Sequence, residues 1–164
     1  MTAGRGLVAA GVLVGLAAGV PSCSRDRKVS PPAAGRPGLV HATGLVLAAP
    51  PPEFQVRETP TGFRVDPANA RSVRNPWSLD LRLTGEDPPG AAETRKIDDR
   101  DAHYRLEVDP DAGSGGPLHT LTAWIACGSR RIVLIATQQA EPPERPDWTP
   151  AWAVLAASRC LPPG

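Results

Sequence analysis

The sequence predicts an α+β domain, with an antiparallel sheet of about six strands and a C-terminal helix packed on one face. Three observations support this fold class. Several segments alternate apolar and polar residues with a period of two, as a strand with one buried face requires. One run, Ile132 to Ala136 ("IVLIA"), is apolar without a break. Near the C-terminus, "TPAWAV" from Thr149 combines a helix start signal with an apolar helical face.

The first strands are short and are bounded by turn residues. Leu45 to Ala48 is an apolar run that stops at Pro50, because consecutive prolines cannot donate to a sheet ladder. Residues 54–58 and 62–65 alternate on either side of "TPTG" and predict a hairpin. The next strand, "WSLDLRLTG", directs Leu79, Leu81 and Leu83 to one face. The segment that follows, residues 85–101, is rich in polar residues, proline and glycine, and is expected to be an exposed loop.

The second half of the chain repeats the strand pattern with longer runs. Residues 103–108 alternate, and residues 118–127 and 130–137 run as two strands about "CGSR". The unbroken apolar run 132–136 predicts a central strand that is covered on both faces.

The C-terminal helix is expected to supply one of those covers. Thr149 is the predicted N-cap, Pro150 takes the first helical position, and Pro162 ends the helix. Its buried face, at i, i+3 and i+4, is predicted to carry Trp152, Leu155 and Ala156.

The N-terminal residues predict an export signal and a tether before the domain. Residues 1–22 contain one charge, Arg5, before an apolar run of signal-peptide length. Residues 23–38 combine charge, proline and glycine with little to bury, which favours a flexible tether, and residues 39–164 form a single domain. The stretch "VPSC" resembles the end of bacterial lipoprotein signals, with Cys23 as the lipidated residue and Pro21 as a departure. The alternative is ordinary secretion, with cleavage after Ser22.

The cysteines and the charge balance limit the cellular environment and the kinds of partner that the sequence allows. If Cys23 carries lipid, Cys127 and Cys160 remain as a pair, which forms either a disulfide in an oxidising envelope or two buried thiols. Without the Arg5 segment the chain has 17 basic and 17 acidic residues. This balance, without a basic stripe, argues against nucleic-acid binding.

The loop "DPDAGSGG", residues 109–116, is the main candidate for a binding site. A phosphate-binding loop is excluded, because no lysine is near and Pro117 follows the last glycine. Asp109 and Asp111 fit the first positions of a calcium loop, but the other ligand positions do not match. The remaining readings are a hairpin tip, a partner-recognition loop or a weak calcium contact at the surface.

Other reactive side chains do not assemble into a convincing site. If Val108 faces Leu118, then Glu107 faces His119, and His103 lies near Ala123, so the two histidines would not share a zinc ion. A catalytic trio lacks the nucleophile elbow it would need; its members would be Asp109, Ser114 and His119. An acidic cluster consists of Asp98, Asp99 and Asp101 and is interrupted by Arg100. We expect it to be a solvated loop. Core packing is the expected role of the four tryptophans, Trp77, Trp124, Trp148 and Trp152.

The order of several motifs resembles a known family over residues 62–160. These are a lipoprotein-type signal followed by "VRNPWSLDLRL" (73–83), "HYRLEV" (103–108), "GSGG" (113–116) and "QQAEPPERPDWTPAWAVLAASRC" (138–160). They resemble the periplasmic immunity lipoproteins that protect type VI secreting bacteria from their own peptidoglycan-cutting muramidase effector. They also look like the broader Mog1/PsbP-like fold.

The resemblance implies a non-enzymatic inhibitor that has no cofactor or metal of its own and plugs the effector's cleft with loops. The expected partner-binding residues are Asp111, Gly113, Ser114, Gly115 and Gly116. The protein would face the periplasm on a lipid anchor, or be secreted if Cys23 is not lipidated. Two other hypotheses remain: a small-molecule-binding or envelope-assembly lipoprotein of the same fold, and a hydrolase with Ser114 and His119 within hydrogen-bond reach.

Overall fold

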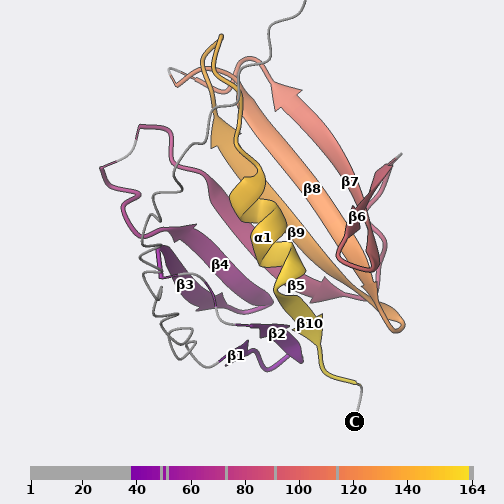
Figure 1. The fold of residues 1–164 in the computed structure, drawn as a ribbon. Helices are drawn as coiled ribbons and strands as arrows, with labels where there is room; N and C mark the ends of the chain where they lie inside the picture. Colours follow the sequence, from indigo (N-terminus) through magenta and orange to yellow (C-terminus); the bar gives the residue numbers. More distant parts are fainter. Residues whose placement is uncertain are drawn as a thin grey trace, which may run out of the picture. The chain divides into compact units, whose positions relative to one another are not determined.

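A computed structural model describes residues 38–48, 50, 52–72, 74–90, 92–113 and 115–162. In these ranges the chain forms ten strands and one helix (Figure 1). The elements are β1 (Leu39–Val40), β2 (Leu45–Leu47), β3 (Phe54–Thr59), β4 (Gly62–Pro67), β5 (Ser78–Thr84), β6 (Glu93–Ile97), β7 (Arg100–Asp109), β8 (Leu118–Cys127), β9 (Arg130–Gln139), α1 (Thr149–Ala156) and β10 (Ser158–Cys160). The predicted signal peptide, Cys23 and almost all of the tether lie outside the described residues.

The strands form two antiparallel sheets. The larger has seven strands in the order β3-β4-β5-β9-β8-β7-β6, and the smaller has the order β1-β2-β10. The antiparallel sheet with a C-terminal helix is therefore confirmed, while the prediction of one sheet of about six strands was too low. The predicted hairpin about Pro60 is present, with Thr59 opposite Gly62.

The core lies between α1 and one face of the large sheet. β9 is central, and its residues Ile132, Leu134 and Ala136 are at most 1% exposed. Across the ladder, Leu134 faces Leu81 and Ala123, both of which are also buried. On the opposite face Val133 is buried beside its cross-strand neighbour Trp124, and the loop after β5 is tied to that side by an ion pair between Asp87 and Arg131 at 2.6 Å. The central position of β9 is confirmed, and its opposite face is covered in part, because Val133 is buried and Ile135 is half-buried.

The helix differs from its prediction in three details. Trp148 is the N-cap, one residue before the predicted Thr149, and Asp147 Oδ1 accepts the N–H of Thr149 at 2.9 Å. The buried face is shifted and consists of Ala151, Val154 and Leu155, whereas Trp152 and Ala156 are half-buried. The helix ends at Ala156 instead of continuing toward Pro162, since the chain turns into β10.

The prediction of an exposed loop over residues 85–101 was wrong in its second part. Residues Glu93–Ile97 form β6, which pairs with β7 alone within the described part of the chain and is the edge of the large sheet. All of β6 except Ile97 is exposed. A strand with a single neighbour and little burial carries the polar composition that otherwise indicates a loop.

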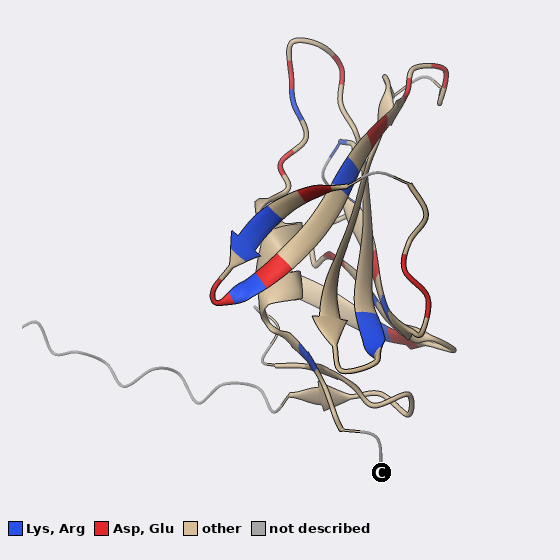
Figure 2. Cartoon of the chain, turned by 90° about the vertical axis from the view of Figure 1, so that its right-hand side faces the viewer, with Lys and Arg blue, Asp and Glu red and all other residues tan. Residues whose placement is uncertain are grey.

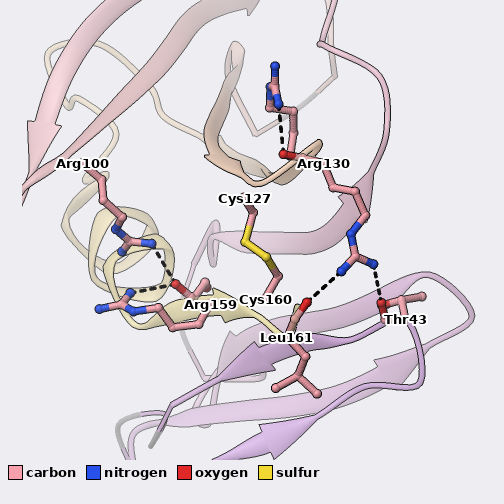
Figure 3. Close-up of a disulfide and its surroundings, with 9 residues drawn as sticks. Thr43, Arg100, Cys127, Arg130, Arg159, Cys160 and Leu161 are labelled. Carbon is pink, nitrogen blue, oxygen red and sulfur yellow. Dashed lines mark hydrogen bonds between the residues drawn. A yellow bond between two sulfur atoms is a disulfide. The ribbon is translucent and has the colours of Figure 1, made fainter. Parts of the chain in front are cut away.

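The small sheet is fastened to the β8–β9 turn (Figure 3). Cys127 at the end of β8 and Cys160 in β10 form a disulfide. Beside it, the Arg130 guanidinium donates to the carbonyls of Thr43 and Leu161, each at 2.9 Å. Three segments far apart in sequence are held together in this way, and we call this arrangement the C-terminal clamp.

Candidate partner-binding end of the sheet

Three loops meet at the end of the large sheet that lies away from the C-terminal clamp. They are residues 68–77 between β4 and β5, residues 110–117 between β7 and β8, and residues 140–148 between β9 and α1. The antiparallel register places them together, because Ser78, Thr137, Thr120 and Glu107 are consecutive partners across the sheet. We call this region the three-loop end.

Hydrogen bonds hold the glycine-rich loop against its neighbours. Asn75 Nδ2 donates to the carbonyl of Gly115 at 3.2 Å, and the N–H of Ala140 donates to the carbonyl of Pro117, also at 3.2 Å. Gln139 Nε2 lies 3.5 Å from the carbonyls of Ala112 and Gly116. Arg74 and Glu141 add an ion pair at 3.0 Å between the other two loops. The loop is therefore positioned by residues on both sides of it.

The predicted partner-binding residues divide into inner and outer positions. Gly115 and Gly116 are inner: a Cβ on Gly115 would overlap the side-chain oxygen of Gln139, and one on Gly116, whose φ is +85°, would lie 2.8 Å from Glu141 Cγ. Gly113 and Asp111 are exposed, and a Cβ on Gly113 would meet nothing within 4 Å. Ser114 lies outside the described residues. A partner would therefore meet Asp111 and Gly113 first, while Gly115 and Gly116 shape the loop.

Acidic side chains outnumber basic ones at this end, where Arg71, Arg74 and Arg145 are also exposed. In Figure 2 the end of β7 and the connection before α1 both project beyond the sheet and carry mostly acidic colour. The exposed acids are Glu107, Asp109, Asp111, Glu144 and Asp147. Hydrogen bonds from the backbone and side chain of Thr149 hold the pKa of Asp147 below its ordinary value. These carboxylates favour a partner with basic groups.

The predicted pairing between β7 and β8 differs from the structure. The β7–β8 register differs by one residue, with Val108 opposite His119, Glu107 opposite Thr120 and His103 opposite Trp124. The pairing of Glu107 with His119 was therefore wrong, because a shift of one residue moves a side chain to the other face of the sheet. His103 stacks on Trp124, with ring centroids 5.8 Å apart.

The remaining histidine and the acidic cluster have structural roles. His41 is buried; its Nδ1 accepts the N–H of Thr43, so Nε2 carries the proton and donates to the carbonyl of Thr59 at 2.8 Å. Asp98 and Asp99 form the tip of the β6–β7 hairpin, and Asp101 pairs with Lys96 at 2.8 Å. Among the described residues no three His, Cys, Asp or Glu side chains lie close enough together to hold a metal ion.

Sequence reasoning missed the residues that position the loop. Asn75 has a positive φ of 55° and precedes a proline, and the Asn-Pro pair is a turn signal that could have marked it. Gln139 ends a long apolar strand with an amide, but its contact with the glycine-rich loop comes from the strand order and has no local sequence signal. Within the described ranges, no helix is both long and apolar enough to cross a membrane.

Comparison with known proteins assigns the chain to a family. Residues 47–159 match the type six secretion immunity 3 domain, so the match runs from the end of β2 into β10 and includes all three loops. The chain is 36% identical over 121 residues to "Immune protein Tsi3" of Pseudomonas aeruginosa (strain PAO1), covering 74% of this chain and 80% of that protein. Immunity proteins of this kind act by inhibiting a protein toxin and are not enzymes. This chain belongs to the type six secretion immunity 3 family.

Proposed function

We propose that this protein is an envelope-anchored lipoprotein that neutralises a peptidoglycan-degrading type VI effector by placing its three-loop end in the effector's substrate cleft. The observation that carries the proposal is the construction of that end. The glycine-rich loop projects beyond the sheet, yet the side chain of Asn75 and the backbone of Ala140 hold it from both sides. Contacts that hold part of a loop before binding reduce the conformational entropy lost on association, which favours tight inhibition.

Expression of a candidate effector, sought among the genes next to the one for this chain and directed to the periplasm, tests the proposal. The effector alone should lyse the cells, and co-expression of this protein should restore growth. Purified effector should release fragments from peptidoglycan sacculi, and an equimolar amount of this protein should stop that release. An effector that neither binds the protein nor degrades peptidoglycan would contradict the proposal.

A charge reversal at the loop tests which surface inhibits. Asp111→Lys should leave folding intact, because Asp111 is exposed, and should weaken inhibition. Glu86→Lys is the matched control, since Glu86 is also exposed but follows β5 at the opposite end of the sheet. If both variants inhibit the effector equally well, the glycine-rich loop is not part of the interface.

The anchor is proposed from the "VPSC" stretch and has a separate test. The mature protein should carry a diacylated Cys23, which would be seen as a mass increase that Cys23→Ser abolishes. It should sediment with the membrane fraction and lie on the periplasmic side of the membrane. A soluble mature protein without lipid would indicate secretion instead.

We also propose a Mog1/PsbP-like fold, supported by an antiparallel sheet with a helix on one face. The same fold with a small-molecule ligand would call for a cavity between α1 and the sheet. That space is filled by Leu134, Val154 and Leu155, which are at most 1% exposed. This packing favours protein binding as the function.

A further inference from the structure

An apolar groove lies at the three-loop end, on the face of the sheet that α1 covers elsewhere. One wall is formed by Leu106 and Val108 of β7, the other by Pro146 and Trp148 ahead of α1, and His119 lies between them. Leu106 and Val108 are each 56% exposed. The other large exposed hydrophobic residues in the described ranges are Leu39, Val40 and Leu161, in or beside the small sheet.

The groove exists because β7 extends beyond the elements that cover it. Alternation along the strand places Leu106 and Val108 on the same face as Tyr104, whose ring packs edge-on against Trp152 of α1 at 5.4 Å. The helix begins only at Thr149, and its axis leaves the end of β7 uncovered in Figure 1. Two aliphatic side chains on neighbouring positions of one face are therefore left open to solvent.

The same part of β7 also has a free edge. Pairing with β6 ends where Glu93 faces Tyr104, whereas β7 continues to Asp109. Among the described residues, 105–109 pair with a strand on the β8 side alone, so their outward backbone groups have no strand partner there and could pair with another strand. A second hollow, lined by Glu93, Tyr104, Arg105 and Leu106 with Ala92, marks the point where β6 stops. An open edge beside exposed aliphatic side chains is the arrangement used in strand addition.

The charges around this edge indicate what the incoming strand should carry. Glu107 lines the groove, and Glu93, the first residue of β6, lines the second hollow. Further exposed carboxylates lie close in sequence to the lining residues, and these are Asp109, Asp111, Glu144 and Asp147. The bases that line the two hollows are Arg105, which pairs with Glu107 at 3.2 Å, and Arg145. The excess of carboxylates would attract a basic strand and repel an acidic one.

We propose that the effector supplies an extended, basic segment that pairs with the free edge of β7 at residues 105–109 and packs its apolar side chains against Leu106 and Val108. This inference rests on the proposed function, and it assigns part of the interface to the sheet edge as well as to the loops. Backbone pairing would supply register, and the groove would select aliphatic or aromatic side chains at alternate positions.

The test measures the affinity of the neighbouring-gene effector for the full mature protein and for two double variants. Leu106→Ser with Val108→Ser should weaken binding by about tenfold or more, equivalent to about 1.4 kcal/mol. Leu39→Ser with Val40→Ser makes the same chemical change in the small sheet and should leave the affinity within about twofold. Circular dichroism and melting curves should show that both variants fold.

Two further measurements test the pairing and the charge. Amide hydrogen exchange should slow at residues 105–109 when the effector binds, and the protected effector segment should be rich in Lys or Arg. Raising the ionic strength should weaken the wild-type complex, and Glu144→Lys should reduce that salt dependence.

The outcomes separate this inference from the proposed function. If the wild-type protein does not bind the effector, both are wrong. If it binds and the Leu106/Val108 variant binds equally well, the edge pairing is wrong and the immunity function stands. A wild-type dimer that the Leu106/Val108 variant dissolves would assign the groove to a second copy of this chain, and an acidic protected segment would overturn the partner chemistry.

Discussion

At the scale of single residues, Arg100 connects the start of β7 to the end of α1. Its guanidinium donates to the carbonyls of Ser158 at 2.9 Å and Ala156 at 2.7 Å, with Leu155 at 3.4 Å. The carbonyls of Leu155 and Ala156 lie at the C-terminus of α1, where hydrogen-bond acceptors are left over and a cation is favourable. Ser158 is the first residue of β10. Burial, together with the nearby Arg159, lowers the pKa of Arg100 from its ordinary value.

Arg100→Met should therefore destabilise the protein by about 1 kcal/mol, because these carbonyls lose one charged donor while the aliphatic stem is kept and Arg159 still donates to Ala156 and Ser158. Arg82→Met at an exposed position of β5 is the control and should change stability little. Urea unfolding followed by tryptophan fluorescence measures both. Equal stability of the two variants would show that the Arg100 contacts contribute nothing net.

Asp66 predicts how stability depends on pH. Burial alone would raise its pKa, but hydrogen bonds from Arg57 and Ser78, with the charges of Arg64 and Arg57, hold the pKa below its ordinary value of 3.8. A carboxyl with a lowered pKa in the folded state stabilises the fold above the unfolded-state pKa, and that contribution is lost as the pH falls through the folded-state value.

Asp66→Asn should consequently be less stable than the wild type at neutral pH, with the difference shrinking as the pH falls below 3.8. Unfolding curves at pH values from neutral to about 2.5 measure the difference. Asp80→Asn is the control, since the Asp80 carboxyl is 52% exposed and 3.6 Å from Arg64. A difference for Asp66→Asn that stays constant across this range would contradict the assignment.

At the scale of elements, the sequence predicted what local pattern controls. Four strands have sequences that alternate or are uniformly apolar, and the structure places each within a few residues of its predicted bounds. They are β5, β7, β8 and β9. β6 was missed because a polar edge strand resembles a loop. β10 was missed because its partner, β2, is more than a hundred residues away and no local periodicity records that pairing.

The candidate site was predicted in part for the same reason. Glycine spacing identified residues 113–116 as a loop, but it could not separate the inner Gly115 and Gly116 from the outer Gly113. That division depends on Gln139 and Asn75, which strand order brings beside the loop. The register of β7 against β8 was one residue off because it is set by the length and conformation of the intervening loop.

The disulfide is the element-scale feature with the largest expected effect on stability. It links β8 to β10 across a sequence separation of 33 residues. The loop-entropy model gives about 3 to 4 kcal/mol for a loop of that size, reached mainly by restricting the unfolded chain. Cys127→Ser with Cys160→Ser should lower the free energy of unfolding by that order, and dithiothreitol should destabilise the wild type but not the variant. A reductant effect of equal size on both would exclude this bond as the cause.

At the scale of the whole domain, β8 and β9 run from the C-terminal clamp to the three-loop end. The clamp depends on the disulfide and on Arg130, whereas the three-loop end depends on Asn75, Gln139 and the backbone of Ala140. The two sets share no residue. Effects of substitutions at distant sites without shared partners are usually additive. Stability and partner binding should therefore be separable by substitutions at the two ends.

A pair of variants tests that separation. Asn75→Gly keeps a residue that tolerates the positive φ of 55° but removes the donor to the Gly115 carbonyl, so Gly115 is held less firmly before binding. It should cost less than about 1 kcal/mol of stability and weaken effector binding by several-fold, because the loop must then be ordered on association. The Cys127→Ser/Cys160→Ser variant should do the reverse, with a lower melting temperature and unchanged affinity at a temperature where it remains folded. Calorimetry measures the melting temperature of each variant and its affinity for the same effector. A loss of affinity in the cysteine variant would show instead that the C-terminal clamp and the three-loop end are coupled through β8 and β9.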